Sequence, residues 1–226
     1  MTEDAGSDFE SITLDSGLIL TYSNHLQGGG NTARYDFIDI LTSIGKTYKN
    51  GFEWCAGHGI IGFEMLIKNF CENIYFSDIF PPAIDNCLRV AKENNISDRV
   101  FAYVSPTIKD LPVMQPIDLV VSNPPHHSDI NLWNKTLFPG HDVSNVKSYD
   151  RSIRIGVDDQ FKIHEEFFAN IAERLSDDAD IFLSESGISQ PIIDIAKKYN
   201  FICVKIYENK KTQYNGETIH FKVKNK

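Results

Sequence analysis

"FEWCAGHGIIGFEMLIKNFCENIYFS", residues 52–77, contains two short apolar runs separated by a glycine-rich turn and a longer apolar segment. The runs 52–56 and 73–77 are rich in aromatic and β-branched residues, which favours strands. Residues 60–70, IIGFEMLIKNF, are long enough for a helix. Strand, helix and strand in succession predict two parallel strands joined by a helical crossover.

The same alternation continues to the end of the chain. Strands are expected at 100–104, 117–122, 180–186, 201–208 and 218–223, and helices at 82–95, 159–175 and 190–199. Alternation of this kind predicts a mostly parallel sheet with helices on both faces. Residues 209–217 are too few for a helical crossover, so the last two strands must pair antiparallel. The sequence therefore predicts an α/β fold with a doubly wound, mostly parallel, seven-stranded sheet that ends in an antiparallel hairpin.

The segment before this alternation has a different pattern. SITLDSGLILTY (11–22) predicts a β-hairpin, because alternating residues flank a turn-forming Asp-Ser-Gly cluster. YDFIDILTSIG (35–45) has the apolar spacing of a helix and ends on a glycine. We therefore expect an N-terminal hairpin and helix extension over residues 1–45 and the main domain over residues 46–226.

Composition limits the class of protein. The hydrophobic content of 42% and charged content of 23% are ordinary for a soluble globular chain. No apolar run approaches the length of a membrane span, and the acidic N-terminus lacks the regions of a signal peptide, so we expect a cytoplasmic protein with no membrane partner. The four cysteines have no C-x-x-C spacing, so neither a metal site nor a disulfide framework is predicted.

Charge is distributed unevenly. The net charge of −9 argues against a broad nucleic-acid interface. The segment 197–226, however, is rich in lysine. Lysine commonly protects exposed edge strands, which is the simpler interpretation, and a binding surface for an acidic partner is the alternative.

Ligands of doubly wound sheets bind beyond the carboxyl ends of the strands, and a glycine turn lies at the first of these ends. Gly57 and Gly59 in EWCAGHGIIG (53–62) allow a ligand to approach the backbone, although G-x-G also occurs in plain turns. Asp78 ends the next strand, where a carboxylate can accept hydrogen bonds from both hydroxyls of a ribose. Together these residues indicate a cofactor that contains adenosine. His58, between the glycines, would contact the cofactor or, more commonly for such a residue, face solvent.

An Asn-Pro-Pro-His-His sequence ends the fourth strand, in VVSNPPHHSD (120–129). Two adjacent prolines cannot continue a helix or pair inside a sheet, because neither has an N–H to donate. This loop is therefore either a rigid strand terminator or a fixed binding element.

The three motifs, in this order, resemble the class I S-adenosylmethionine-dependent methyltransferases that carry an N-P-P-aromatic signature. They are E-x-C-A-G-H-G, S-D-I-F-P-P-A and I-D-L-V-V-S-N-P-P-H, and the resemblance covers roughly residues 35–223. That group includes the protein-glutamine N5-, N6-adenine and rRNA guanine-N2 methyltransferases. The resemblance implies a Rossmann-like fold, a methyltransferase and S-adenosyl-L-methionine as the cofactor.

The resemblance also assigns residues to the cofactor. Glu53 stands where the family usually has Asp, Gly57 and Gly59 form the turn under the methionine portion, Asp78 binds the ribose, and Ile79 packs on the adenine. Cys55 replaces the first glycine of the turn, which is tolerable if its backbone is not left-handed. Pro106 replaces an Asp found near the adenine amine in many members, and Ser105 is the residue that can serve instead.

The acceptor site implied by the resemblance is the N-P-P loop. The side-chain oxygen of Asn123 and the carbonyl of Pro124 each accept one N–H of an NH₂ group, which directs the nitrogen lone pair at the methyl group. Pro125 keeps the loop from relaxing. His126 occupies the usual Tyr or Phe position, where it can stack on a planar substrate or accept the proton released. His127 resembles the histidine after N-P-P-F in the rRNA enzymes. For either histidine, a hydrogen bond to the backbone is the alternative role.

A long connection follows this motif. Residues 128–157 include Trp133, Phe138 and Tyr149, and loops of this length in compact domains are commonly functional. We expect a lid over the substrate.

The function we predict is transfer of a methyl group to a planar or amino nitrogen of a protein or peptide side chain or of a small molecule. A nucleic-acid base is the alternative acceptor, which the net charge disfavours and the lysine-rich segment favours. A non-catalytic cofactor-binding protein is a second alternative. G-H-G-I-I-G (57–62) also fits a dinucleotide motif, but the Asn-Pro-Pro loop has no role in hydride transfer. The short segment before Glu53 argues against a release-factor substrate.

Overall fold

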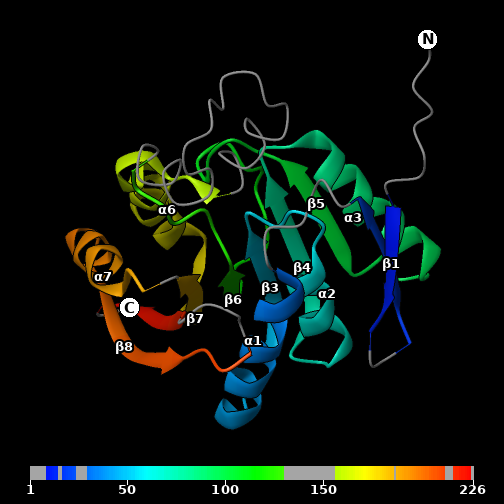
Figure 1. Cartoon of the computed structure of the whole chain (residues 1–226), viewed down its shortest axis with the longest axis horizontal. Helices are drawn as coiled ribbons and strands as arrows, with labels where there is room; N and C mark the ends of the chain where they lie inside the picture. Colours follow the sequence, from blue (N-terminus) through cyan, green and yellow to red (C-terminus); the bar gives the residue numbers. More distant parts are fainter. Residues whose placement is uncertain are drawn as a thin grey trace, which may run out of the picture.

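A seven-stranded sheet with the order β5–β4–β3–β6–β7–β9–β8 forms the centre of the computed structural model (Figure 1). The structure describes residues 9–14, 17–23, 30–129, 156–185, 187–211 and 216–224. The sheet strands are β3 (Tyr48–Trp54), β4 (Cys71–Asp78), β5 (Val100–Val104), β6 (Ile117–Ser122), β7 (Leu175–Glu185), β8 (Phe201–Glu208) and β9 (Glu217–Val223). Strands β3 to β7 pair in parallel, whereas β9 pairs antiparallel with both β7 and β8. The predicted doubly wound sheet with an antiparallel end is confirmed.

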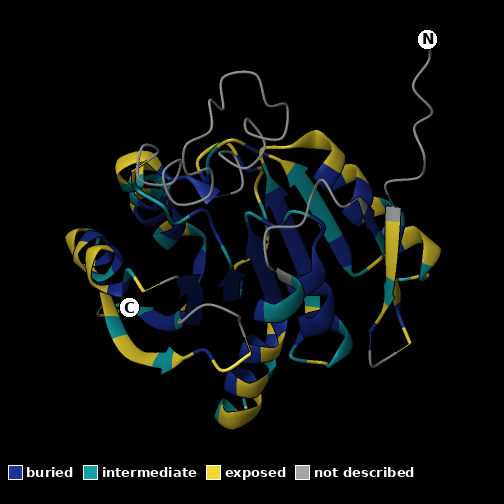
Figure 2. Cartoon of the chain, viewed as in Figure 1, coloured by how far each residue is buried: buried dark blue, intermediate teal, exposed yellow. Residues whose placement is uncertain are grey.

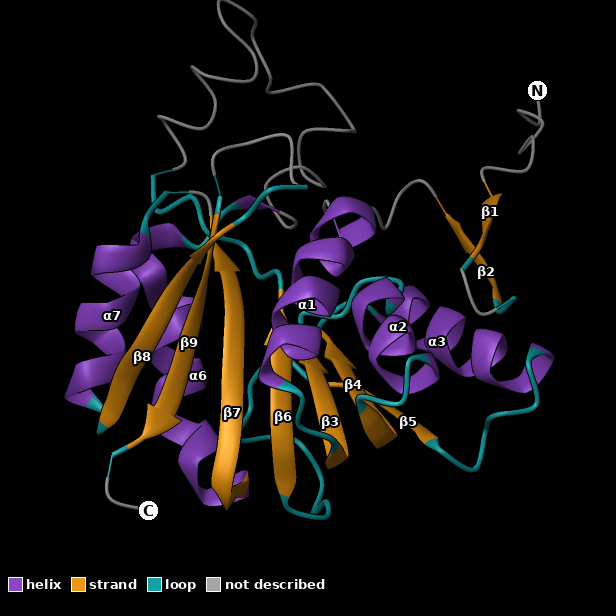
Figure 3. Ribbon diagram, turned by 90° about the horizontal axis from the view of Figure 1, so that it is seen from below, coloured by secondary structure: helices purple, strands orange, loops and turns teal. Residues whose placement is uncertain are grey.

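Helices cover both faces of this sheet (Figure 3). The helical elements are α1 (Gly30–Ile44), α2 (Ile60–Ile67), α3 (Pro81–Glu93), η2 (Asp159–Phe161), α6 (Lys162–Ile171), η3 (Ala172–Arg174) and α7 (Ser189–Lys198). Helices α1, α2 and α3 contribute to one buried apolar cluster, and α6 and α7 contribute to the other. Because neighbouring residues of a strand point to opposite faces, Val121 belongs to the first cluster and Val120 to the second. Figure 2 shows the central strands of the sheet buried between these layers, whereas the edge strand β8 is largely exposed.

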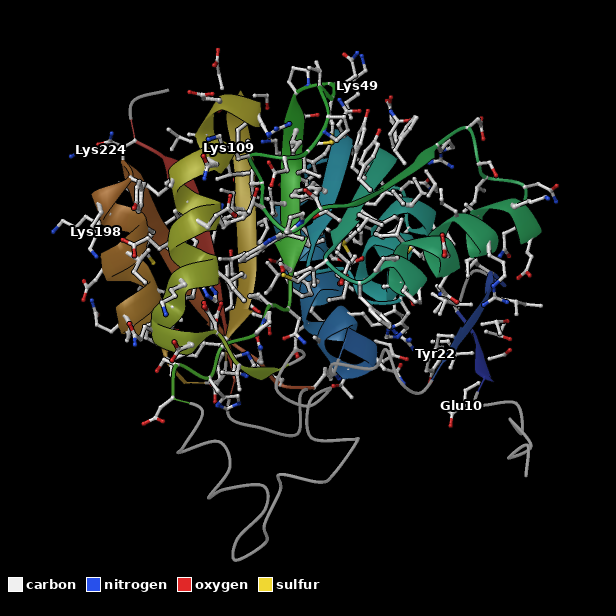
Figure 4. The ribbon with its side chains drawn as sticks, turned by 90° about the horizontal axis from the view of Figure 1, so that it is seen from above. Glu10, Tyr22, Lys49, Lys109, Lys198 and Lys224 are labelled. Atoms are coloured by element: carbon white, nitrogen blue, oxygen red, sulfur yellow. The ribbon has the colours of Figure 1, made fainter. Side chains whose placement is uncertain are left out.

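The predicted N-terminal hairpin is present as β1 (Phe9–Thr13) and β2 (Ile19–Ser23), which pair antiparallel. It is docked on α3, where Arg89 donates to the carbonyl of Thr21 at 3.0 Å. The side chain of Asn94 both accepts from and donates to the backbone of Ile19, at 3.2 and 3.0 Å. Tyr22 donates its hydroxyl to Glu10 at 3.0 Å, and both side chains are labelled in Figure 4.

Some element boundaries differ from the predictions. Helix α1 begins at Gly30, five residues before the predicted 35, because Arg34 lies in a buried ion pair 3.4 Å from Glu64 of α2 and stabilises this early turn. Strand β7 begins at Leu175, inside the segment predicted to be helical, since α6 ends at Ile171. The described residues include no helix that is long and apolar enough to cross a membrane.

A buried carboxylate ties the sheet to the loop before β3. Asp180 of β7 accepts hydrogen bonds from Lys46 at 2.9 Å, from Tyr48 at 2.9 Å and from His220 at 2.7 Å. Burial opposes ionisation, but the hydrogen bonds from His220, Lys46 and Tyr48 outweigh it and lower the pKa of Asp180 below its usual range. The ionised carboxylate is therefore part of the folded state.

We predict that Asp180→Asn lowers the free energy of unfolding at pH 7 by about 2–4 kcal/mol, because it removes the buried charge that Lys46, Tyr48 and His220 all contact. A carboxyl whose pKa is lowered by folding contributes stability above its unfolded pKa of about 3.9 and loses it as the pH falls. The difference between the two proteins should therefore shrink below pH ~4 in urea denaturation. Asp177→Asn, at an exposed position of the same strand, is the control and should leave stability unchanged. Equal stability of Asp180→Asn and wild type at pH 7 would contradict the assignment.

Candidate active site

The three motifs come together at one edge of the sheet, because β3, β4 and β6 are adjacent and parallel. Trp54 at the end of β3 is paired with Ser77 of β4 on one side and with Ser122 of β6 on the other. Strand order reverses between β3 and β6, which is the position where doubly wound sheets bind ligands. The hydroxyl of Ser122 also donates to the carbonyl of Trp54, so the ends of these two strands are linked by a side chain.

The glycine turn is braced by a buried carboxyl group. Glu53 accepts a hydrogen bond of 2.6 Å from the N–H of Gly62, in the first turn of α2. Burial raises the pKa of Glu53 well above its usual range. Gly59 has φ of 77°, and a Cβ there would lie 2.8 Å from the Sγ of Cys87, so both conformation and space require glycine. In this structure Glu53 and Gly59 shape the turn from inside.

Cys55 has a left-handed backbone with φ of 54°. Cysteine in place of glycine was expected to be tolerable only if this backbone were not left-handed, and the structure shows that it is left-handed. A left-handed conformation costs a non-glycine residue roughly 1–2 kcal/mol. Gly57 and Gly59 in the same turn are also left-handed, so the strain falls on Cys55, the one left-handed position of this turn that is not glycine.

Asp78 joins the glycine turn to the end of β4. Its Oδ2 accepts from the N–H of Gly57 at 2.8 Å, and its Oδ1 accepts from the N–H of Phe80 at 2.9 Å. The side chain is half-buried, and burial raises the pKa of its carboxyl group. Each carboxylate oxygen has further lone pairs, so this carboxylate can still accept hydrogen bonds from a ligand. The neighbouring Ile79 is 66% exposed and presents an apolar side chain beside it.

Ser105 follows β5 at the same edge. Its N–H donates to the carbonyl of Asp78 at 2.9 Å, and its hydroxyl donates to the carbonyl of Thr107 at 2.7 Å. Because the hydroxyl hydrogen is used, the oxygen can accept from an amine. Glu166 of α6 accepts from the N–H of Ile108 at 3.0 and 3.1 Å and so holds the loop that follows.

His58 does not face solvent. It is 2% exposed, and its ring lies 4.6 Å from the ring of Tyr22 in the N-terminal hairpin. The expectation of a solvent-facing residue was wrong, because β2 covers this side of the glycine turn. The sequence gives no local signal for this contact, since the two rings come from distant segments.

The N-P-P loop is held in place on both sides. Pro124 and Pro125 are buried, and Asn123 is half-buried. The N–H groups of His126 and His127 both donate to the carbonyl of Gly156, at 3.2 and 2.9 Å. The loop therefore rests on residues that lie far along the chain, beyond the segment 130–155. Most of the predicted lid, with Trp133, Phe138 and Tyr149, falls in that segment, outside the described residues.

The ring of His126 is turned toward the loop's own backbone, with Nδ1 3.1 Å from the carbonyl oxygen of Pro124. Burial lowers the pKa of His126, so the ring is neutral at pH 7 and Nδ1–H is the donor of this contact. The Nε2 atom then carries the free lone pair. The carbonyl of Pro124 has a second lone pair for another donor. Burial also lowers the pKa of His127, whose ring lies 4.7 Å from that of His126.

A buried Asp–His–Glu triad beside this loop was missed by the sequence analysis. Nδ1 of His164 lies 2.6 Å from Asp158, and Nε2 lies 2.9 Å from Glu185. Its residues come from the segment before η2, from α6 and from the end of β7, so no spacing in the sequence reveals the cluster. The available signal is a histidine among the inward-facing residues of α6, three and four positions before Phe167 and Phe168. The described residues include no group that could hold a metal ion.

Comparisons with known proteins agree with this architecture. No family model matches the chain. Over 83 residues it is 31% identical to a release factor glutamine methyltransferase from Aquifex aeolicus, and the match covers 37% of this chain and 29% of that protein. The chain thus matches less than a third of the length of that curated relative.

Three solved structures extend the likeness over most of the chain. The ribosomal protein L11 methylase from Lactobacillus delbrueckii has a TM-score of 0.58 and 13% identity, over 87% of this chain and 81% of that one. The hMettl16 catalytic domain in complex with an RNA hairpin has a TM-score of 0.61 and 14% identity, over 84% of this chain and 69% of that one. The N-methyltransferase NodS from Bradyrhizobium japonicum has a TM-score of 0.54 and 12% identity, over 86% of this chain and 96% of that one. The protein therefore has the fold of the class I S-adenosylmethionine-dependent methyltransferases.

Proposed function

We propose that this protein is an S-adenosyl-L-methionine-dependent N-methyltransferase. The observation that carries the proposal is the position of the Asn-Pro-Pro loop, at the end of β6 and next to the glycine turn of β3. A rigid loop with two acceptors beside a cofactor site is suited to an NH₂ nitrogen. The partial likeness to a glutamine methyltransferase supports the same chemistry. We propose the cytoplasm as the location.

The residues at the strand ends fit the proposed cofactor. Asp78 keeps acceptor capacity for the ribose hydroxyls, and Ile79 offers an exposed apolar side chain to the adenine. Ser105 can accept from the adenine amine. Glu53, Cys55, Gly57 and Gly59 shape the turn for the methionine portion. When bound, this cofactor supplies a methyl group on a positively charged sulfur.

In the proposed acceptor site, Asn123 and Pro124 orient the nitrogen through their two oxygens. Transfer forms a bond between the nitrogen and the methyl carbon, and the pair of the broken S–C bond stays on sulfur. One N–H proton must then leave the nitrogen. Nε2 of His126 is the proposed proton acceptor, because Nδ1–H is already directed at the carbonyl of Pro124. The N–H of His127 holds the loop against Gly156, and Pro125, which is buried, is proposed to keep the loop rigid.

The acceptor we propose is a protein or peptide side chain or a small molecule. The net charge of −9 supports this choice over a nucleic-acid base. Figure 4 shows Lys198 and Lys224 on the side of the molecule formed by α7 and β8, so part of the lysine-rich segment lies around the edge strand. We propose residues 1–45 as an extension that covers the cofactor side of the domain 46–226, since Tyr22 lies on His58.

Methyl transfer can be tested without knowing the acceptor. We expect wild-type protein, incubated with methyl-labelled cofactor and fractionated cell extract, to label the protein or small-molecule fraction. Asn123→Ala should lower labelling at least about 100-fold, because it removes one acceptor that orients the nitrogen, while cofactor affinity stays within a few-fold. Asn73→Ala is the control, because Asn73 lies near the start of β4, at the opposite end of that strand from Asp78. Labelling of the nucleic-acid fraction would select the alternative acceptor, and full activity of Asn123→Ala would refute the role of the loop.

Cofactor binding can be measured separately by calorimetry. We predict that the protein binds S-adenosylmethionine or S-adenosylhomocysteine in preference to NAD. Asp78→Ala should weaken this binding at least about ten-fold, because it removes the ribose acceptor and the brace on Gly57. Asp85→Ala, an exposed change on α3, should have no effect. Tight binding of NAD alone would rule out the proposed cofactor.

The pH dependence should report on His126. Because burial lowers the pKa of His126, the neutral base persists below the ordinary imidazole pKa of about 6.5. We expect the acid limb of kcat/KM, which reports on the free protein, to have its midpoint below pH ~6.5, and His126→Tyr to abolish this limb while a stacking ring is retained. An acid limb unchanged in His126→Tyr would exclude His126 as the proton acceptor.

A further inference from the structure

The triad of Asp158, His164 and Glu185 lies directly beside the proposed acceptor site. In the parallel register of β6 and β7, Ser122 is paired with Leu183, so Glu185 lies two residues further along the same edge as Pro124. The N–H of Asp158 donates to the carbonyl of His127 at 3.0 Å. The triad therefore adjoins the N-P-P loop through both the sheet and the backbone.

Asp158 has all of its acceptor oxygens engaged. Its Oδ1 accepts from the N–H of Ile163 at 2.8 Å, and its Oδ2 contacts both the backbone N–H and Nδ1 of His164, at 3.2 and 2.6 Å. These bonds fix the start of α6 and the orientation of the imidazole. Asp158 therefore acts as an internal anchor.

Glu185 differs from Asp158, because only one of its oxygens is engaged. Oε1 lies 2.9 Å from Nε2 of His164, whereas Oε2 is buried and has no hydrogen-bond partner among the described residues. The residue as a whole is 1% exposed. A buried carboxylate oxygen without a donor is unfavourable, and in native proteins such an atom commonly marks a functional position.

The charges of the triad do not cancel. Burial opposes protonation of His164, but the charge of Glu185 and the contact with Asp158 outweigh it and raise the pKa of His164 to about 9. At pH 7 one imidazolium therefore lies between two carboxylates, which leaves one negative charge in excess. The charge of Glu185 also acts on His126 and on Cys55, so the excess charge is felt at both the N-P-P loop and the glycine turn.

We propose that Glu185 binds the methyl acceptor, with Oε2 accepting an N–H from the nitrogen next to the one that is methylated. The acceptor is then a planar cation in which two nitrogens are bonded to the same carbon, that is, an amidinium or guanidinium group. Its positive charge also compensates the excess negative charge of the triad. A carboxamide fits poorly, because its carbonyl oxygen would face a carboxylate oxygen. This inference rests on the proposed function and specifies its substrate class.

Benzamidine and benzamide provide a matched pair of probes, since they have the same shape. Where benzamidine has a second nitrogen with N–H groups, benzamide has a carbonyl oxygen. In calorimetry with S-adenosylhomocysteine present, we expect the wild-type protein to bind benzamidine at least about ten-fold more tightly than benzamide. Glu185→Gln should remove or reverse this preference, because the amide NH₂ then takes the place of Oε2. Glu173→Gln, at an exposed position of η3, should keep the wild-type preference.

Equal affinity of the wild type for the two probes, or binding of neither, would overturn the inference. An unchanged preference in a folded Glu185→Gln variant would do the same. If that variant does not fold, as judged by thermal unfolding, the wild-type comparison still decides. Because these measurements need no turnover, they separate the two proposals. Asn123-dependent labelling without a preference for benzamidine rejects only the role of Glu185, whereas failure to bind the cofactor rejects the methyltransferase itself.

Discussion

Parallel pairing of β3 with β6 is the interaction on which the candidate site depends. The two strands are far apart in sequence, yet Trp54 and Ser122 are paired at their ends, and the Ser122 hydroxyl is bonded to the carbonyl of Trp54. Without this pairing, the glycine turn and the N-P-P loop would be two unrelated turns. With it, a cofactor at one strand end and an acceptor nitrogen at the next can lie at contact distance.

Carboxyl groups that accept backbone N–H bonds give this edge its rigidity. Glu53 holds the start of α2, Asp78 holds Gly57, and Asp158 holds the start of α6, each by accepting a backbone N–H. These bonds satisfy backbone donors at helix starts and turns. They also support a strained backbone at Cys55, which is kept in the left-handed region by the structure around it. Rigid placement is what an orientation-based transfer requires.

The sequence was informative wherever the signal was local. Strand–helix alternation, the glycine turn, Asp78 and the Asn-Pro-Pro motif each depend on adjacent residues, and the structure places them at one edge as expected. Contacts between distant segments were not accessible. His58 lies under Tyr22, and His164 joins Asp158 to Glu185, because tertiary packing brings together residues that no spacing relates. The backbone conformation of Cys55 could not be inferred from the sequence either, and its left-handed φ is known only from the structure.

The electrostatic character of the candidate site depends on His126 and on the neighbouring triad. A neutral His126, whose Nδ1–H is directed at Pro124, offers a basic ring nitrogen, which neither Tyr nor Phe has. The neighbouring triad adds one uncompensated negative charge. A positively charged sulfonium and an N–H-rich acceptor are both favoured by such surroundings, whereas an acceptor that presents a carbonyl is not. His126 and the open oxygen of Glu185 therefore favour the same proposed class of acceptor, one that carries several N–H groups and releases one proton on methylation.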